Sequence, residues 1–303
     1  MMEREAIIQK FTTLNLWQRN GQRAPHKPLL VLYAIGKLLR DEDRLIPYSE
    51  IDEDLGNLLK EFSPRQSRQG TQYPFWRLQN DSVWDIPHAD QITPNSAGDV
   101  SRRDLLDNNI SGGFHEAIAE QLQSDSTLSF EIIQRLLYIH FPYSIHEDIL
   151  QAVEIEAPLQ IFEPQKQAPK QRKRDPSFRP NILRAYKCKC AVCGFDAKLG
   201  TSPIALEAAH IKWHTHYGPD VVVNGLALCS LHHKLFDRGA FTLSPNREIR
   251  VSSDVNGSVG FEEWLMKFDG KQINLPKKIK DYPAKKFIRW HVKSVFKGDS
   301  RKL

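Results

Sequence analysis

The sequence predicts a chain of the α+β class with two domains, a helical first domain and a smaller second domain of mixed strands and helix. Apolar residues recur at helical spacing through the first 62 residues. A stretch rich in Pro, Gln and basic residues interrupts the chain at 163–176. All four cysteines lie between Cys188 and Cys229, which in a chain without a secretory signal indicates metal binding rather than disulfide bonds.

Five segments of the first domain have the apolar periodicity of amphipathic helices. They span residues 3–16, 28–39, 49–62, 114–122 and 127–140. Pro28 suits the start of the second segment, because the first turn of a helix needs no backbone N–H donor. Ser124 or Asp125 is the expected N-cap of the last segment.

Between the third and fourth segments the pattern changes to that of a short β-hairpin. Residues 73–79 and 83–86 are rich in aromatic and β-branched side chains, and Asn80-Asp81 between them is typical of a turn. Three helices followed by a hairpin predict a winged-helix-like first domain.

The stretch from Glu163 to Pro176 predicts the boundary between the domains. Its single apolar side chain, Ala168, cannot offset the entropy lost when such a segment is ordered. We therefore expect domains at 1–160 and 178–303, joined by a basic linker at 161–177.

Charge is distributed unevenly along the chain. Residues 1–163 hold 15 Lys and Arg against 25 Asp and Glu, whereas residues 164–303 hold 27 against 12. The second half is therefore the candidate for contact with a polyanion. Its last part, 266–303, has 12 basic against 3 acidic residues interleaved with aromatic side chains. This part is expected to lie along a nucleic-acid backbone or to form an amphipathic helix whose aromatic residues pack on the second domain.

Two features bear on the location of the protein. No run of eighteen apolar residues occurs, so the sequence predicts no membrane span. The N-terminus carries charges of both signs and lacks the apolar core of a secretory signal. A cytoplasmic location is therefore expected.

Two cysteine-containing half-sites predict a structural zinc site. Cys190 and Cys193 are two thiolates separated by two residues, and the glycine that follows allows the backbone to turn around an ion. Cys229 and His232 repeat the same spacing. Together they would form a closed, tetrahedral Cys3His site, which leaves Cys188 as a spare thiol.

Four polar residues between and after these half-sites have the chemistry that phosphodiester hydrolysis requires. A base must activate water, and a divalent ion such as Mg²⁺ or Mn²⁺ must hold the scissile phosphate. His210, at the end of an expected strand, can act as the base, and Asn224 can bridge the loop and fix its orientation. His233 and Asp237 are four residues apart on an expected helix, so they face one side and can hold the ion.

Residues 180–245 contain the string A-A-H-I … N-G-L-A-L-C-x-x-H-H-x-x-F-D-x-G. This segment resembles the HNH nuclease superfamily, in particular the branch found in modification-dependent restriction enzymes. The resemblance implies a ββα-metal fold with His210 as general base, Asn224 as orienting residue and His233 as a metal ligand. It makes Asp237 a second ligand of the catalytic ion.

One position departs from the pattern of this superfamily. Many members have an acidic metal ligand directly before the first histidine, where this chain has Ala209. Glu207, His214 or Asp237 could replace that ligand, or fewer protein groups could hold the ion.

The first domain has two stretches that are free of acidic residues, 6–40 and 62–80. Within them, R-A-P-H-K-P-L-L and Y-P-F-W-R-L resemble the sulfur-binding domain of phosphorothioate-dependent restriction endonucleases. A phosphate sulfur is larger and softer than oxygen, so its reader needs a small apolar cup with cations nearby. The residues that the resemblance implies for sulfur and DNA binding are Arg23, His26, Lys27, Tyr73, Pro74, Arg77 and Arg102.

Within that set, Tyr73 and Pro74 would form the wall of the cup, and Arg102 with Arg103 would contact bases or neighbouring phosphates. The alternative is that the aromatic residues of this segment fill the core. We expect that alternative for Phe75 and Trp76.

These observations predict a modification-dependent restriction endonuclease that binds double-stranded phosphorothioate DNA and cuts it nearby. Two other functions stay open: an HNH nuclease gated by a methylated or otherwise modified base, and a non-catalytic zinc-containing DNA-binding regulator. Double-strand cleavage by one active site per chain makes a homodimer an expectation.

Overall fold

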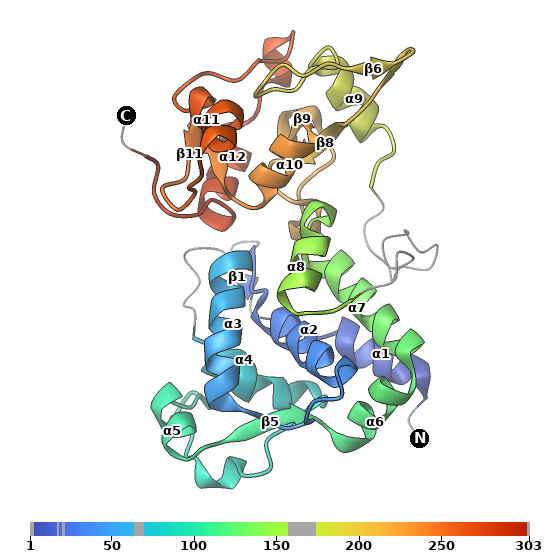
Figure 1. Cartoon of the computed structure of the whole chain (residues 1–303), viewed down its shortest axis with the longest axis vertical. Coiled ribbons are helices and arrows are strands. Elements are labelled where there is room, and N and C mark those ends of the chain that lie inside the picture. Colours follow the sequence, from blue (N-terminus) through green and yellow to red (C-terminus); the bar gives the residue numbers. More distant parts are fainter. Residues whose placement is uncertain (1–2, 17, 20–21, 64–69, 157–173, 302–303) are drawn as a thin grey trace. The chain divides into compact units, whose positions relative to one another are not determined.

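The computed structural model describes residues 3–16, 18–19, 22–63, 70–156 and 174–301, and for residues 18–19 and 22–23 the backbone alone (Figure 1). The chain divides into two compact units, and most of the predicted linker lies outside the described residues. Among the described helices, none has the length and apolar character that a membrane span requires.

The first unit is mainly helical. Its helices are α1 (Arg4–Thr12), α2 (His26–Leu39), α3 (Tyr48–Phe62), α4 (Gln72–Arg77), α5 (Arg102–Asp107), α6 (Glu116–Ser124), α7 (Ser126–His140) and α8 (His146–Ala152). Helix α2 packs against α3, α4, α6 and α7, and its residues Leu29–Leu32 are wholly buried. A helix that is apolar on all sides must be covered on all sides, which is why α2 forms the centre of the unit (Figure 1).

Two small sheets complete the first unit. β1 (Gln18–Arg19) pairs with β2 (Gln22–Arg23), and a three-stranded antiparallel sheet has the order β3-β5-β4. Its strands are β3 (Ile46–Pro47), β5 (Ser111–Phe114) and β4 (Trp84–Asp85). The predicted α+β class is confirmed, as are the five helices to within a few residues. Asp125 caps α7 by accepting a hydrogen bond from the Leu128 N–H at 3.0 Å.

The predicted β-hairpin at 73–86 is wrong. Residues 72–77 form α4, which continues as the 3₁₀ helix η1 (Leu78–Asp81), and Trp84 pairs with Phe114 of β5 instead. Two of the aromatic residues that favoured a strand, Phe75 and Trp84, fill the core between helix and sheet, with edge-on rings whose centroids are 6.1 Å apart, whereas Tyr73 and Trp76 are half-buried. Gly112 permits this packing, because a Cβ there would lie 2.8 Å from both rings. Tertiary packing therefore overrides the local strand preference.

The second unit is built on a β-hairpin followed by a helix (Figure 1). β8 (Leu206–His210) pairs antiparallel with β9 (Gly225–Cys229), from Leu206 opposite Cys229 to His210 opposite Gly225, and α10 (Ser230–Asp237) follows directly. The remaining elements are α9 (Phe178–Ala185), β6 (Lys198–Leu199), β7 (Ser202–Pro203), β10 (Phe241–Leu243), β11 (Ile249–Val251), α11 (Val259–Trp264) and α12 (Lys285–Ser294).

Helix α9 covers the end of the hairpin that carries His210. A Cβ on Gly225 would lie 2.2 Å from Ile182 and 3.0 Å from Phe178, so glycine lets α9 approach the strand. At the C-terminal end of the unit, α12 buries Phe287 and Trp290, while its lysines 285 and 286 are exposed. The aromatic residues of this basic segment therefore pack in the second unit, as expected for an amphipathic helix that lies on this domain.

Candidate active site and metal centre

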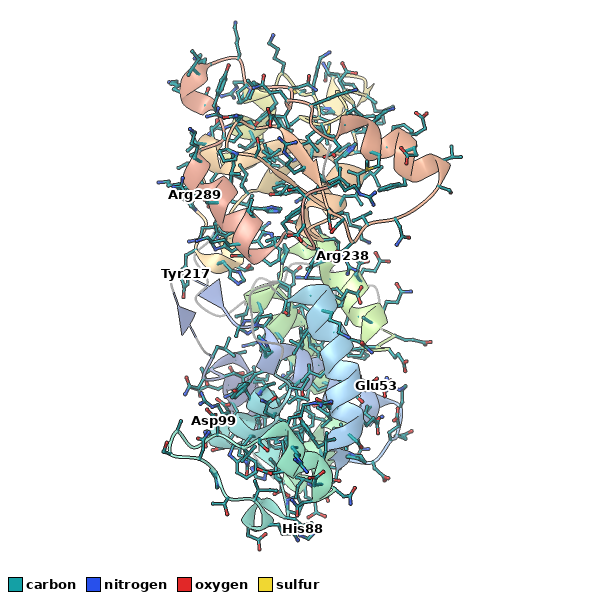
Figure 2. The ribbon with its side chains drawn as sticks, turned by 90° about the vertical axis from the view of Figure 1, so that its left-hand side faces the viewer. Glu53, His88, Asp99, Tyr217, Arg238 and Arg289 are labelled. Carbon is teal, nitrogen blue, oxygen red and sulfur yellow. The ribbon has the colours of Figure 1, made fainter. Side chains whose placement is uncertain are left out.

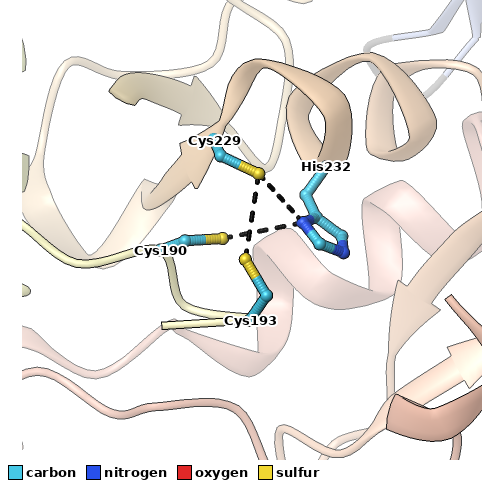
Figure 3. A group of neighbouring side chains, drawn as sticks. All are labelled: Cys190, Cys193, Cys229 and His232. Carbon is cyan, nitrogen blue, oxygen red and sulfur yellow. Dashed lines mark hydrogen bonds between the residues drawn. The ribbon is translucent and has the colours of Figure 1, made fainter. Parts of the chain in front are cut away.

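Three cysteines and one histidine form a compact cluster in the second unit (Figure 3). Their ligand atoms all lie within 4.8 Å of one another. The Sγ atoms of Cys193 and Cys229 are 3.9 Å apart, and Nδ1 of His232 lies 3.0 Å from Sγ of Cys229 and 3.8 Å from Sγ of Cys190. The cluster has the four residues that the sequence predicted and could hold a metal ion.

The backbone around the cluster is shaped for an ion. Gly194, which follows the first pair of cysteines, has φ +76°, a conformation that a side chain would disfavour. Nε2 of His232 donates to the carbonyl oxygen of Trp264 at 2.9 Å, so Nδ1 is the nitrogen that faces the thiols. Burial would lower the pKa of His232, but its hydrogen bonds with the sulfur atoms of Cys190 and Cys193 raise it to about 9.

His210 is held at the end of β8 by contacts on two sides. Its ring stacks on Phe178 with centroids 4.0 Å apart and planes 15° apart. Its Nε2 lies 2.7 Å from Oδ1 of Asp220, and both side chains are almost buried. Burial lowers the pKa of His210 to about 4, although the carboxylate of Asp220 opposes the shift. The imidazole is therefore neutral at pH 7 and able to accept a proton.

Asn224 closes the loop between β8 and β9. Its Nδ2 donates to the carbonyl oxygens of Lys212 and Pro219 at 3.1 and 3.0 Å, and its Oδ1 accepts from the Lys212 N–H at 2.9 Å. Its backbone oxygen accepts from the N–H of Ile211 at 2.9 Å. Asn224 thus bridges the loop as the sequence predicted.

His233 lies on α10 between two carboxylates. Its Nδ1 is 2.6 Å from Oε2 of Glu207, and its Nε2 is 3.1 Å from Oδ2 of Asp237. Asp237 also accepts from Nε1 of Trp213 at 2.8 Å, and Glu207 accepts from Oγ of Ser230 at 2.6 Å. Burial would lower the pKa of His233, but Asp237 and Glu207 raise it to about 9.

The hydrogen bonds of His233 indicate which side chains could replace the acidic metal ligand that is missing at Ala209. Its methyl group is wholly buried and offers no ligand atom. Glu207 and Asp237 both contact His233, whereas His214 lies beside Asp220, with Nε2 3.8 Å from Oδ2, and beside the ring of His210. The acidic groups next to His233 are therefore Glu207 and Asp237.

In the first unit, helix α4 carries Tyr73 and Pro74. Side-chain contacts hold the residue before α4 and the last residue of η1, the 3₁₀ helix that follows it. At the start of α4, Asp52 accepts a hydrogen bond from the Thr71 hydroxyl and hydrogen bonds from both Nε and Nη2 of Arg102. At the end of η1, Asp81 forms a buried ion pair with Lys27. Lys27 and Arg102 are thus joined to opposite ends of the segment that bears the proposed sulfur cup.

Each of the four predicted DNA-binding lysines and arginines whose side chain is described has an aspartate partner. The other two pairs are Arg77 with Asp99, at 2.6 Å, and the exposed Arg103 with Asp107, at 3.2 Å (Figure 2 labels Asp99). Pro74 is buried, Tyr73 is half-buried and His26 is buried at the start of α2. The side chain of Arg23 lies outside the described residues.

Sequence reasoning missed the acidic partners. Asp220 contacts His210, and Asp52 and Asp81 orient two of the predicted cations. Asp220 could have been noticed because it lies four residues before Asn224 in the same loop. Asp52 lies in the acidic run I-D-E-D, where nothing distinguishes it from a solvated neighbour.

Two family models match this chain, one in each of its two units. A model described as the ScoMcrA-like DNA sulfur-binding domain matches residues 4–158, and a model of the HNH endonuclease matches residues 190–244. No curated protein matches the chain.

Several solved structures are similar to parts of the chain. The sulfur-binding domain of ScoMcrA complexed with phosphorothioated DNA is 25% identical, covering 48% of this chain and 96% of that one, with a TM-score of 0.41. The corresponding SprMcrA complex is 20% identical and covers 51% and 95%, with a TM-score of 0.44. The type IV phosphorothioation-dependent restriction endonuclease ScoMcrA is 14% identical and covers 75% and 93%, with a TM-score of 0.40.

Proposed function

This chain belongs to the ScoMcrA-like DNA sulfur-binding domain family, and from that premise we propose that it is a phosphorothioate-dependent restriction endonuclease. The observation that carries the proposal is that one chain joins a DNA sulfur-binding domain to an HNH endonuclease domain. In the HNH domain, three side chains of suitable chemistry lie on β8, the following loop and α10: His210, Asn224 and His233.

In this function His210 is the general base. With a pKa of about 4 it is unprotonated at neutral pH, so it can take a proton from the attacking water molecule. Phe178 and Asp220 keep the ring from rotating, and Asn224 keeps the loop closed behind it.

His233, Glu207 and Asp237 would hold the catalytic divalent ion, Mg²⁺ or Mn²⁺. An imidazole nitrogen with carboxylate oxygens is a donor set that such ions accept. Because Glu207 contacts Nδ1 and Asp237 contacts Nε2 of His233, one carboxylate can keep its hydrogen bond and orient the ring. The other carboxylate and the nitrogen that it contacts would bind the ion, once that nitrogen has lost its proton. When bound, the ion would hold the scissile phosphate and stabilise charge on the leaving oxygen.

The Cys3His cluster would hold a structural zinc ion. The 3.9 Å between Cys193 and Cys229 is close to the edge of about 3.8 Å that a tetrahedron with Zn–S distances of about 2.3 Å requires. Four protein ligands fill the coordination sphere, so this ion would support the fold and take no part in cleavage.

In the first unit, Tyr73 and Pro74 would contact the sulfur, while Lys27, Arg77 and Arg102 would bind the surrounding phosphates. Their ion pairs with aspartates fix the direction of each cation before DNA arrives. The first unit is acidic overall, so this local set would provide its DNA contact.

A binding experiment tests whether the first unit recognises phosphorothioate DNA. Gel shifts would compare two duplexes of one sequence, with and without a single phosphorothioate, using the wild type and Tyr73→Ala. We expect the wild type to prefer the sulfur duplex and Tyr73→Ala to lose that preference, whereas Tyr143→Ala, an exposed tyrosine of the same unit, keeps it. Equal binding of both duplexes by the wild type contradicts the phosphorothioate proposal and favours gating by a modified base.

A cleavage experiment tests the catalytic function. Wild type, His210→Ala and the control His88→Ala, at an exposed histidine of the first unit (Figure 2), would be incubated with sulfur-containing DNA and Mn²⁺ or Mg²⁺. We expect His210→Ala to lower the rate about 10²- to 10⁴-fold, the usual contribution of a general base. Sulfur-dependent binding without metal-dependent cutting by any of the three proteins would favour a non-catalytic regulator.

A further inference from the structure

The loop between β8 and β9 brings an acidic side chain, Asp220, to the proposed base, His210. Oδ1 of Asp220 lies 2.7 Å from Nε2 of His210, and the two side chains are only 5% and 8% exposed. An ion pair on the surface contributes little, but a contact this short between two buried side chains fixes the orientation of both.

Asp220 is itself held by a backbone group before α9 and by the closure of its own loop. Its other oxygen, Oδ2, accepts a hydrogen bond from the backbone N–H of Asp175 at 2.9 Å. The residue just before it, Pro219, has its carbonyl oxygen bound by Nδ2 of Asn224 at 3.0 Å. Among the described hydrogen bonds of Asn224, none reaches the ring of His210. The amide of Asn224 therefore reaches His210 through the loop that carries Asp220.

We propose that Asp220 is the positioning residue of the nuclease site: it receives the Nε2–H of His210 and so leaves Nδ1 as the nitrogen that accepts the proton from water. The proposal rests on the assignment of His210 as the base. Asn224 then acts through Asp220, because it closes the loop in which the carboxylate is presented.

The chemistry of the pair supports this direction of hydrogen bonding. Burial would raise the pKa of Asp220, but the N–H of Asp175 and the imidazole of His210 outweigh it and lower the pKa, so the carboxylate is ionised and acts as acceptor. In the described part of the chain, Nδ1 of His210 has no protein hydrogen-bond partner. A water molecule can therefore occupy that side of the ring.

The reaction step balances with this tautomer. The water oxygen forms a bond to phosphorus while its proton passes to Nδ1, and the bond between phosphorus and the leaving oxygen breaks. The leaving oxygen takes a proton from solvent, and His210 later returns its own to solvent. The imidazolium that forms in between is stabilised by the carboxylate of Asp220.

The test compares Asp220→Ala and Asp220→Asn with the wild type, in the full chain. The matched control is Asp196→Ala, which removes an exposed aspartate of the same unit. Three quantities are measured: the nicking rate at saturating DNA, the dissociation constant for DNA, and the tautomer of His210 from ¹⁵N chemical shifts of histidine-labelled protein. The His210 signals are assigned by their loss in His210→Ala.

We expect Asp220→Ala to lower the nicking rate by about 10²-fold, part of the contribution of a general base, while DNA affinity stays within about twofold. Asp220→Asn also lowers the rate, because its single carbonyl oxygen cannot accept from both the Asp175 N–H and the Nε2–H. When that oxygen faces Asp175, the amide NH2 donates to Nε2 and the ring proton moves to Nδ1. The wild type shows a protonated Nε2 and an unprotonated Nδ1, and Asp220→Ala shows a mixture of tautomers.

Two results overturn the proposal: wild-type nicking by Asp220→Ala, or a proton on Nδ1 of His210 in the wild type. Should Asp220→Ala fail to fold, Asp220→Asn and the wild-type tautomer still decide the question. Wild-type nicking by His210→Ala would instead refute the assignment of the base, and the ¹⁵N shifts would continue to report on the pair.

Discussion

Two helices, one in each unit, begin in different ways. Helix α7 of the first unit is capped by its own sequence, because the Asp125 carboxylate accepts from the Leu128 N–H at 3.0 Å. Helix α10 of the second unit begins after Cys229, which offers no side-chain cap. Instead, Cys229 and His232 place the first turn of α10 in the proposed zinc site. None of the four α-helices described in the second unit has a side-chain cap hydrogen bond.

The two units also differ in the length of the helices and strands that form their cores. The first unit contains α2, α3 and α7, of 14, 15 and 15 residues, packed around wholly buried leucines and isoleucines. The second unit has helices of 6 to 10 residues and strands of 5 residues or fewer among those described. The binding energy of a closed metal site is part of the folding energy, so we infer that the second unit depends on the proposed zinc ion for stability and the first does not.

The largest expected effect follows from removing a zinc ligand. Cys190→Ser should unfold the second unit and leave the first folded, because the binding energy of a structural zinc ion, on the order of 10 kcal/mol, is part of the folding energy. Limited proteolysis with mass spectrometry would identify the surviving fragment. Cys188→Ser, at the cysteine outside the cluster, is the control and should behave as wild type. Equal protection of both units in Cys190→Ser would remove the basis of the comparison.

The second prediction concerns the ion pairs of the first unit. Asp81→Ala leaves Lys27 charged and buried without its partner, so it should destabilise the first unit by about 3–5 kcal/mol. Asp196→Ala breaks the pair with Lys189, in which both side chains are 53% exposed, and should cost much less, because solvent screens an exposed pair. Urea unfolding of both variants measures the two values. Equal losses would mean that the Lys27 pair contributes no more than a surface contact.

The residues of the second unit could be predicted from the sequence because their signals are local. The two half-sites of the metal cluster each span four residues, and His233 is four residues from Asp237 on one helix. The proximity of the four cluster residues is confirmed, whereas the catalytic roles of His210, Asn224 and His233 stay predictions. Asp220 escaped notice because its role depends on the direction of a side chain in an irregular loop.

The failure at residues 73–86 has a related cause. Strand β5, which pairs with Trp84, contains two consecutive glycines, and glycine has low strand propensity. The local sequence therefore does not identify β5 as the partner of Trp84. It instead favours pairing between the two aromatic segments on either side of Asn80. Pro74 is a local signal against a strand, because proline cannot donate a hydrogen bond to a neighbouring strand, and it suits the first turn of α4, where its missing N–H costs nothing.

The third prediction concerns how the free energy of unfolding of the second unit depends on pH. His291 is wholly buried, and burial lowers its pKa to about 4 although Asp237 and the Phe236 carbonyl oppose the shift. The unfolded chain therefore binds more protons between about pH 6.5 and 4, so the free energy of unfolding falls as pH decreases through that range. From pH 7 to pH 5 the loss from this group is about 2 kcal/mol.

His291→Gln should lack that part of the pH dependence. A glutamine can still donate to the Phe236 carbonyl and accept from the Thr242 hydroxyl, the two groups that His291 contacts. Urea unfolding of the second unit at pH 7 and pH 5, in wild type and variant, gives the difference in slope. The same loss in both proteins would show that His291 does not carry this proton linkage.

The smallest expected effect returns to the cap of α7. Asp125→Ala removes the acceptor for the Leu128 N–H and should cost the first unit about 1 kcal/mol. Ser124→Ala is the matched control: its hydroxyl donates to the Glu120 carbonyl at the end of α6, so it should cost much less. The second unit, whose helices begin without such caps, should be unaffected by either change. A larger loss in Ser124→Ala than in Asp125→Ala, measured by urea unfolding, would reverse the assignment of the cap and weaken the contrast with α10.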